Sequence, residues 1–117
     1  MAKAANSTDI QAKCAVMVYM AGDNNGDGTA LRDIAEMAKV GSTKDVNVLV
    51  QLDRIEDKLT RRFRITKGGG FKKDCVANFG DTNTGDPKVL FDFVNWAGQN
   101  YPVDRHALIL WNHGSGW

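Results

Sequence analysis

The chain has 117 residues, a length that fits a single domain, and its 43% hydrophobic and 25% charged residues are the balance of an ordinary globular protein. Its formal net charge of +1 gives no general attraction to nucleic acid or to a membrane, so neither is expected as a partner. Two cysteines are too few to indicate a disulfide framework.

The first half of the chain is predicted to contain a leader, a strand, a helix and a second strand. Residues 1–12 are polar and small, so we expect a flexible leader and no secretory signal; the protein is then cytoplasmic, or its export signal lies outside this sequence. A continuous apolar run at 14–21 predicts a buried parallel strand, and the largely apolar stretch at 46–52 predicts a second strand. The helix is predicted over 29–40, with a left-handed cap at Gly41. Its apolar face consists of Leu31, Ile34, Ala35 and Ala38.

The middle of the chain is predicted to form a small antiparallel hairpin beside these strands. Residues 61–66 alternate between polar and apolar side chains, which is typical of an edge strand. After a turn at 67–70, residues 75–79 are expected to return as the partner strand. The basic residues of the first hairpin strand, at 61–66, are interpreted as a solvated face, because no aromatic stacking platform for nucleic acid accompanies them. These residues are Arg61, Arg62 and Arg64.

A second helix and a third buried strand complete the predicted elements. Asp86 suits the N-cap of the helix, and Pro87 suits its first turn. The helix ends before Pro102, and the apolar run at 107–111 predicts the third parallel strand. The apolar positions of the helix are Leu90, Phe93, Val94 and Ala97. Three parallel strands with two helices leave an apolar edge open, so we expect this chain to be part of a longer or two-chain protein.

The third predicted strand runs directly into a histidine flanked by small residues. Reacting groups of parallel α/β proteins lie beyond the carboxyl ends of the strands, which makes His113 a candidate base. The backbone N–H of Gly114 has no side chain to screen it and can donate to a developing negative charge. Ser115 is too close on the same loop to be the nucleophile, Cys14 begins its strand at the opposite edge, and Cys75 lies outside the parallel strands. The residues therefore indicate half of a catalytic site.

The loop after the first strand has the polar residues of a cation site. Asp23, Asn25, Asp27 and Gly28 match the opening of an EF-hand calcium loop. The twelfth position, where a bidentate glutamate belongs, is Ile34, and a strand precedes the loop instead of a helix. An EF-hand is therefore excluded, and a looser Ca²⁺ site at the first three residues remains open.

Two further interpretations of this loop have less support. Gly22, Gly26 and Gly28 do not have the spacing of a dinucleotide-binding loop. Asp23 and Asp53 follow neighbouring predicted strands, as the paired carboxylates of a Mg²⁺ site do. Aspartate is also common in loops and caps, and that structural interpretation is favoured here.

Several stretches, taken together and in order, resemble the clostripain family of cysteine peptidases. They are 16–25, 41–42, 46–54, 85–88 and 107–117, and the motif at 112–117 is the most specific of them. The resemblance implies a caspase-like, three-layer α/β/α sandwich with a parallel sheet, of which residues 13–117 would be the N-terminal portion. Together with the hairpin, this incomplete sandwich is the predicted fold.

The resemblance also implies a function for the histidine motif. His113 matches the catalytic histidine of the family, and Gly114 matches the glycine whose N–H contributes to the oxyanion hole. Family members cleave after basic residues, chiefly arginine with lysine as the second candidate, and are often secreted; some need calcium and internal cleavage. The nucleophilic cysteine and the acidic substrate pocket would lie beyond Trp117, so this chain alone is expected to be inactive.

The resemblance is incomplete in the first loop, and a second function stays open. Relatives continue there with bulkier, acidic residues, whereas this chain has glycine at 26 and 28. The alternative is a non-catalytic interaction module on the same fold, binding a cation through Asp23, Asn25 and Asp27. The peptidase chemistry itself would require no cofactor, and the peptidase would act on a peptide or protein substrate.

Overall fold

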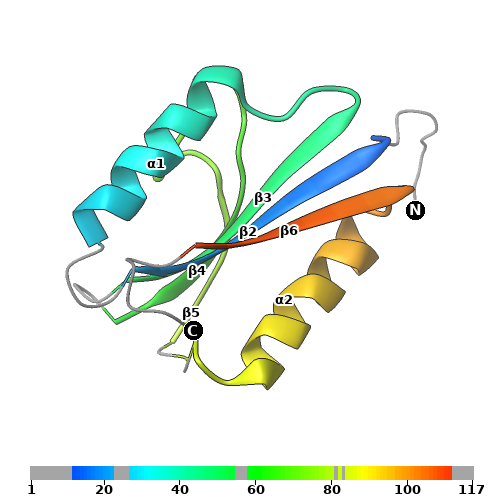
Figure 1. Ribbon diagram of the computed structural model, residues 1–117. Helices are drawn as coiled ribbons and strands as arrows, with labels where there is room; N and C mark the ends of the chain where they lie inside the picture. The colour runs from blue at the N-terminus through cyan, green and yellow to red at the C-terminus, as the bar shows by residue number, and fades with distance from the viewer. Residues whose placement is uncertain (1–11, 23–26, 55–57, 81, 83, 112–117) are drawn as a thin grey trace.

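The computed structural model describes residues 12–22, 27–54, 58–80, 82 and 84–111, which form a three-layer α/β/α arrangement. The elements are β2 (Cys14–Gly22), α1 (Asp27–Val40), β3 (Val46–Arg54), β4 (Thr60–Arg64), β5 (Cys75–Phe79), α2 (Pro87–Asn100) and β6 (Arg105–Trp111). One five-stranded sheet in the order β5-β4-β3-β2-β6 lies between α1 on one face and α2 on the other (Figure 1). The predicted α/β/α class is thereby confirmed.

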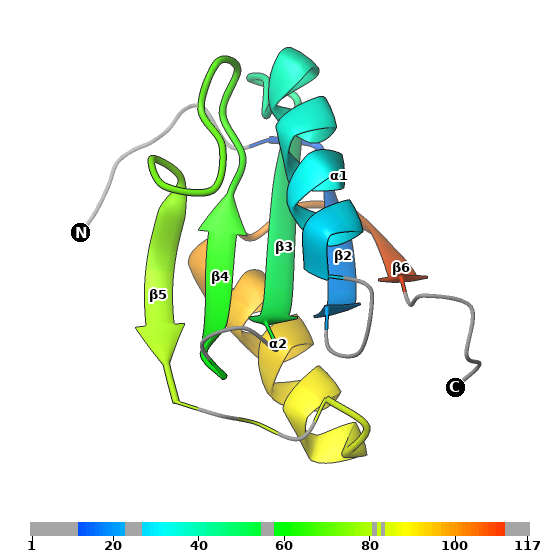
Figure 2. The ribbon, with the colours of Figure 1, turned by 90° about the vertical axis from the view of Figure 1, so that its left-hand side faces the viewer.

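The three apolar runs of the sequence form the parallel part of the sheet. β2 lies in the middle and pairs in parallel with β3 on one side and with β6 on the other. Cys14 is opposite Arg105 at the start of these strands, and Met20 is opposite Trp111 near their ends. Figure 2 shows the strands side by side, with α1 in front of the sheet and α2 behind it. Helices on both faces explain why β2 has no polar alternation.

The hairpin is not a separate feature but an extension of the main sheet. β4 pairs antiparallel with β3 and with β5, so the edge strand is β5, and the prediction that residues 61–66 form an edge strand was wrong. Phe63 lies opposite Val50 and is fully buried beneath α1. An inner strand also alternates between polar and apolar side chains when one of its faces is buried and the other carries polar residues. Alternation alone therefore did not distinguish an inner strand from an edge strand.

The arginines of β4 are partly buried, so the predicted solvated face was also wrong. Nε of Arg62 donates to Oε1 of Gln51 at 2.7 Å, and Nε of Arg64 donates to Oδ1 of Asn47 at 3.0 Å. The Arg62 guanidinium also lies 5.1 Å from the centre of the Trp96 ring on α2. Arg62 thus covers an aromatic ring on the α2 face, and the Arg61 guanidinium lies 4.9 Å from the centre of the Phe71 ring. A count of charges in the sequence does not reveal these contacts.

Two apolar clusters, one on each face of the sheet, form the core. The cluster beneath α1 includes Val18, Met20, Ala30, Ile34, Ala38, Val50, Leu52, Phe63 and Ile65. The cluster beneath α2 includes Ala15, Met17, Tyr19, Leu49, Phe93 and Ala97. The predicted face of α2 is confirmed, whereas in α1 Ala35 is exposed and Ala30 takes its place in the core. None of the helices in the described ranges is long and apolar enough to cross a membrane.

The predicted N-cap of α2 and the predicted C-terminal cap of α1 are confirmed, whereas α1 begins at Asp27, two residues before its predicted start. The carboxylate of Asp86 accepts a hydrogen bond from the backbone N–H of Lys88 at 2.9 Å, as an N-cap does. Gly41 ends α1 with a φ of 70°, and its N–H donates to the carbonyl of Met37. A Cβ at Gly41 would lie 2.1 Å from the backbone nitrogen of Lys67, so this position requires glycine for space as well as for conformation.

Candidate active site

The carboxyl ends of β2, β3 and β6 lie at one edge of the sheet. The parallel register places Gly22 opposite Arg54 and Met20 opposite Trp111. Ligands and reacting groups of open α/β sheets are found in this position, beyond the carboxyl ends of parallel strands. The candidate site is therefore the space into which these three strands lead.

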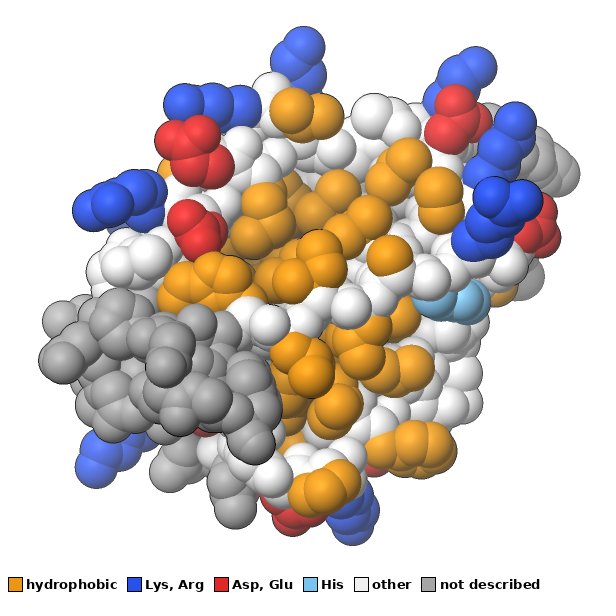
Figure 3. All heavy atoms as spheres, viewed as in Figure 1, with side chains coloured by type: hydrophobic (Ala, Val, Ile, Leu, Met, Phe, Trp, Pro, Cys, Tyr) orange, Lys and Arg blue, Asp and Glu red, His pale blue; other side chains and the backbone are white. Residues whose placement is uncertain are grey.

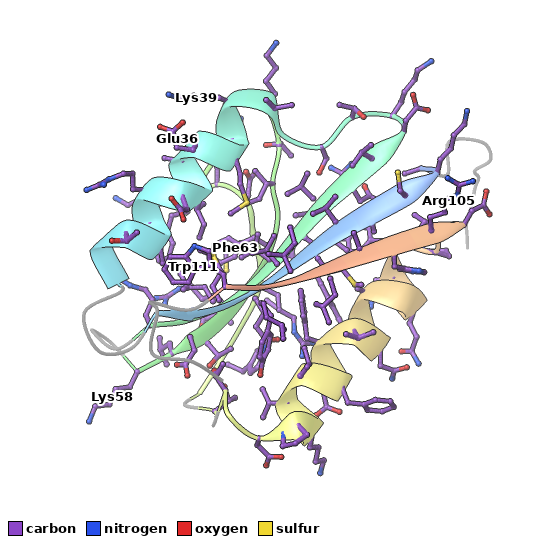
Figure 4. All side chains as sticks on the ribbon, viewed as in Figure 1. Glu36, Lys39, Lys58, Phe63, Arg105 and Trp111 are labelled. Atoms are coloured by element: carbon purple, nitrogen blue, oxygen red, sulfur yellow. The ribbon has the colours of Figure 1, made fainter. Side chains whose placement is uncertain are left out.

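Trp111 holds the end of β6 in place. The other six residues of the strand are exposed, whereas Trp111 is partly buried and packs against the core cluster beneath α1 (Figure 4). Its indole Nε1 donates a hydrogen bond to Oδ2 of Asp33 on α1 at 2.7 Å. The two residues are 78 positions apart, so sequence spacing could not reveal this contact.

His113 and Gly114 both lie outside the described residues. They follow Trp111 by two and three positions, and two residues of fully extended chain span at most about 7 Å. The structure thus describes the strand from which this segment leaves, at the predicted edge of the sheet. The assignment of His113 as base and of Gly114 as oxyanion donor stays a prediction.

A hydrogen-bond network at the same edge ties the loop before α2 to the sheet. The hydroxyl of Thr84 donates to Oδ2 of Asp53 at 2.8 Å, and the hydroxyl of Tyr19 donates to the carbonyl of Thr84 at 2.9 Å. Burial raises the pKa of Tyr19 to about 12, a shift that the hydrogen bond to Thr84 partly opposes, so the phenol stays protonated. Asp53 is 7% exposed and thus anchors the loop, a role that the sequence did not reveal.

The predicted cation site is not described by the structure. Asp23 and Asn25 lie outside the described residues, and Asp27 is the first residue of α1, with its side chain also outside them. Among the residues that are described, no three or more His, Cys, Asp or Glu side chains gather to hold a metal ion. The Ca²⁺ site at these three residues stays a prediction.

Neither cysteine is near the end of β6. Cys14 lies beside Arg105, the first residue of β6, and is therefore about 20 Å from Trp111 at a rise of roughly 3.3 Å per residue. Cys75 belongs to β5, the outermost strand on the other side, about 19 Å away at a strand spacing of roughly 4.8 Å. A nucleophile next to the end of β6 would have to come from outside the described residues of this chain.

Comparison with known sequences identifies the family. The profile of the clostripain family matches residues 18–117. The chain is 31% identical over 126 aligned positions to clostripain from Hathewaya histolytica, and the alignment covers 89% of this chain. It spans only 24% of that relative, so this chain corresponds to about a quarter of the relative's length.

Solved structures of the same family have the same fold. A cysteine protease of B. fragilis is 28% identical and superposes with a TM-score of 0.72, covering 90% of this chain and 92% of the other. A secreted C11 cysteine protease of Bacteroides thetaiotaomicron, solved with an irreversible peptide inhibitor, has the same identity and TM-score and covers 91% of this chain and 31% of the other. The predicted caspase-like architecture and the resemblance found in the sequence are confirmed: the chain belongs to the clostripain family.

Proposed function

We propose that this chain is the histidine-bearing part of a cysteine endopeptidase. The observation that supports the proposal best is the position of β6, a parallel strand whose carboxyl end leads directly into Asn112-His113-Gly114. The family relationship supports cysteine protease chemistry, and the inhibitor complex of the Bacteroides thetaiotaomicron relative supports a peptide as the kind of substrate.

The nucleophile is proposed to come from the remainder of the domain. Leu108, Ile109 and Leu110 are 42%, 47% and 47% exposed, and because neighbours in a strand alternate, both faces of β6 are open. Figure 3 shows hydrophobic side chains gathered along this side of the molecule, between the two helices. Parallel strands are normally covered on both faces, so a further strand beside β6, with its own helices, would complete the sheet and carry the cysteine.

In the proposed reaction the cysteine thiolate attacks the carbonyl carbon of the scissile peptide bond. The carbonyl oxygen becomes an oxyanion, and the N–H of Gly114 donates a hydrogen bond to it. Protonated His113 gives its proton to the leaving amine as the C–N bond breaks. Water, activated by the now neutral imidazole, then hydrolyses the thioester and releases the second product.

The proposed substrates are peptides with a basic residue, arginine or lysine, before the cleaved bond. The acidic residues that would recognise this side chain belong to the remainder of the domain, together with the cysteine. Calcium bound by Asp23, Asn25 and Asp27 is proposed as a structural ion of the same enzyme.

The test compares the two histidines of the chain in the complete protein. His113→Ala should lower kcat on an arginyl peptide substrate by roughly 10²–10⁴-fold, because it removes the general acid and base. His106→Ala is the matched control, since His106 lies near the start of β6, away from the carboxyl end of the strand, and should leave the kcat of folded protein unchanged. Near-normal turnover by a folded His113→Ala variant would refute the assignment.

A further inference from the structure

The hydrogen bond between Trp111 and Asp33 joins the end of β6 to the helix above it. Its length of 2.7 Å is short for an N–H donor, as expected when the acceptor is a carboxylate. Both side chains are partly buried, which shields the bond from competing water. The contact therefore fixes the orientation of the indole ring relative to α1.

Apart from this contact and its main-chain pairing with β2, β6 has little packing in the described part of the chain. It pairs with β2 along one edge only, and its residues before Trp111 are all exposed. Trp111 is the residue of β6 that packs into the core beneath α1, and Met20, its neighbour on β2, is fully buried there. Beyond its pairing with Met20, the last residue of the strand is thus held by a ring in the core and by one hydrogen bond to a helix.

The simplest role of Asp33 would be to satisfy the indole N–H of a tryptophan. A partly buried tryptophan at the open end of an edge strand could instead direct its N–H to solvent. Here the indole N–H donates to a carboxylate on another layer of the sandwich. Trp111 itself lies two residues before His113 in the sequence. Because the indole is packed in the core and bonded to α1, the backbone of Trp111, from which the following segment leaves, is restrained as well.

We propose that Asp33 is a positioning residue for His113, acting through the indole of Trp111. The inference rests on the proposed peptidase function and adds to it a residue on α1 that touches no substrate. Misplacing a catalytic group by about 1 Å costs up to roughly 10²-fold in rate, so a loosened end of β6 should affect turnover more than binding. The chain thereby couples the first helix of the domain to the base of the catalytic site.

The test uses the complete protein with an arginyl peptide substrate. Asp33→Ala should lower kcat by about 10–100-fold with KM nearly unchanged. Asp33→Asn should retain most of the activity, because the amide oxygen still accepts the indole hydrogen bond. Glu36→Ala is the control on the same helix: Glu36 is exposed, bonds only to Lys39 among the interactions described, and should leave kcat unchanged.

A second change separates positioning from a general loss of stability. Trp111→Phe keeps a ring in the core but removes the donor, so its effect and that of Asp33→Ala should not add in the double variant. The proposal would be overturned if the effects of the two substitutions on kcat were additive, or if Asp33→Ala and Asp33→Asn lowered kcat equally. It would also be overturned if the loss of activity only matched the loss of folded protein.

Failure of the proposed function would look different. In that case His113→Ala would leave kcat unchanged, both with Asp33 present and in the Asp33→Ala background. The indole N–H of Trp111 offers a readout that does not need activity: its NMR shift and slow hydrogen exchange should be lost in Asp33→Ala and kept in Asp33→Asn. An unchanged indole signal in Asp33→Ala would overturn the positioning role by itself.

Discussion

At the residue scale, the carboxylate of Asp74 organises the loop between β4 and β5. Its Oδ2 accepts hydrogen bonds from the backbone N–H groups of Thr66 and Gly70, at 2.9 and 2.8 Å, and its Oδ1 accepts one from the hydroxyl of Thr66 at 2.6 Å. A Cβ at Gly69 would lie 2.1 Å from Oδ2, so the loop closes tightly around the carboxylate. The loop conformation thus depends on one charged group that is only 5% exposed.

This geometry predicts how stability changes with pH. Burial raises the pKa of Asp74, but the hydrogen bonds from Thr66 and Gly70 outweigh burial and hold the pKa below its ordinary value of 3.8. Because the folded state lowers the pKa, the stabilisation is present above the unfolded value and is lost as the pH falls through the folded value. Asp74→Asn should therefore cost about 2 kcal/mol at pH 7 and progressively less below pH ~4.

Urea unfolding of the complete protein between pH 7 and pH 2 measures this difference. Asp104→Asn is the matched control, because Asp104 is exposed and the same isosteric change there should have little effect at any pH. A difference between wild type and Asp74→Asn that stays constant over the whole pH range would contradict the account of Asp74.

At the element scale, β6 has three consecutive exposed apolar residues, Leu108, Ile109 and Leu110, whereas β5 at the opposite edge has one exposed large apolar residue, Val76. If a further strand and helix cover it in the complete protein, Ile109→Glu places a charge in a buried layer and should destabilise the protein by about 3–5 kcal/mol. Val76→Glu on the opposite edge strand is the control, since Val76 is 50% exposed and belongs to a strand for which no cover is proposed.

Urea unfolding of both variants measures whether β6 is covered in the complete protein. The control should change the free energy of unfolding by no more than about 0.5 kcal/mol. Equal, small effects of the two substitutions would show that β6 stays uncovered in the complete protein, and the proposed remainder of the sheet would have to lie elsewhere.

The elements themselves were largely predictable, because each depends on signals within a few residues. Asp86 and Pro87 marked the start of α2, and Gly41 marked the end of α1. The strands of the hairpin were also found, but not the edge at which they join the sheet. That pairing joins residues of β3 and β4 through main-chain hydrogen bonds, which leave little trace in side-chain pattern.

At the scale of the whole molecule, the sequence predicted that the carboxyl ends of the three parallel strands share one edge of the sheet, but not the side-chain contacts at that edge. The carboxyl ends of parallel strands lie at the same edge of a sheet, so the end of β6 could be placed beside those of β2 and β3 from the three strands predicted in the sequence. The contact between Asp33 and Trp111, and that between Thr84 and Asp53, join residues far apart in the chain, and nothing in their local sequence marks them. Such contacts appear only when the layers are assembled.

We propose that β6 leads into the base of a cysteine peptidase whose nucleophile belongs to the remainder of the domain. The most direct measurement treats the complete protein with an irreversible peptide inhibitor that ends in arginine, and locates the modified residue by mass spectrometry. We expect one modified cysteine outside residues 1–117, with much slower labelling in His113→Ala and normal labelling in His106→Ala. Modification of Cys14 or Cys75, or no modified cysteine at all, would contradict it.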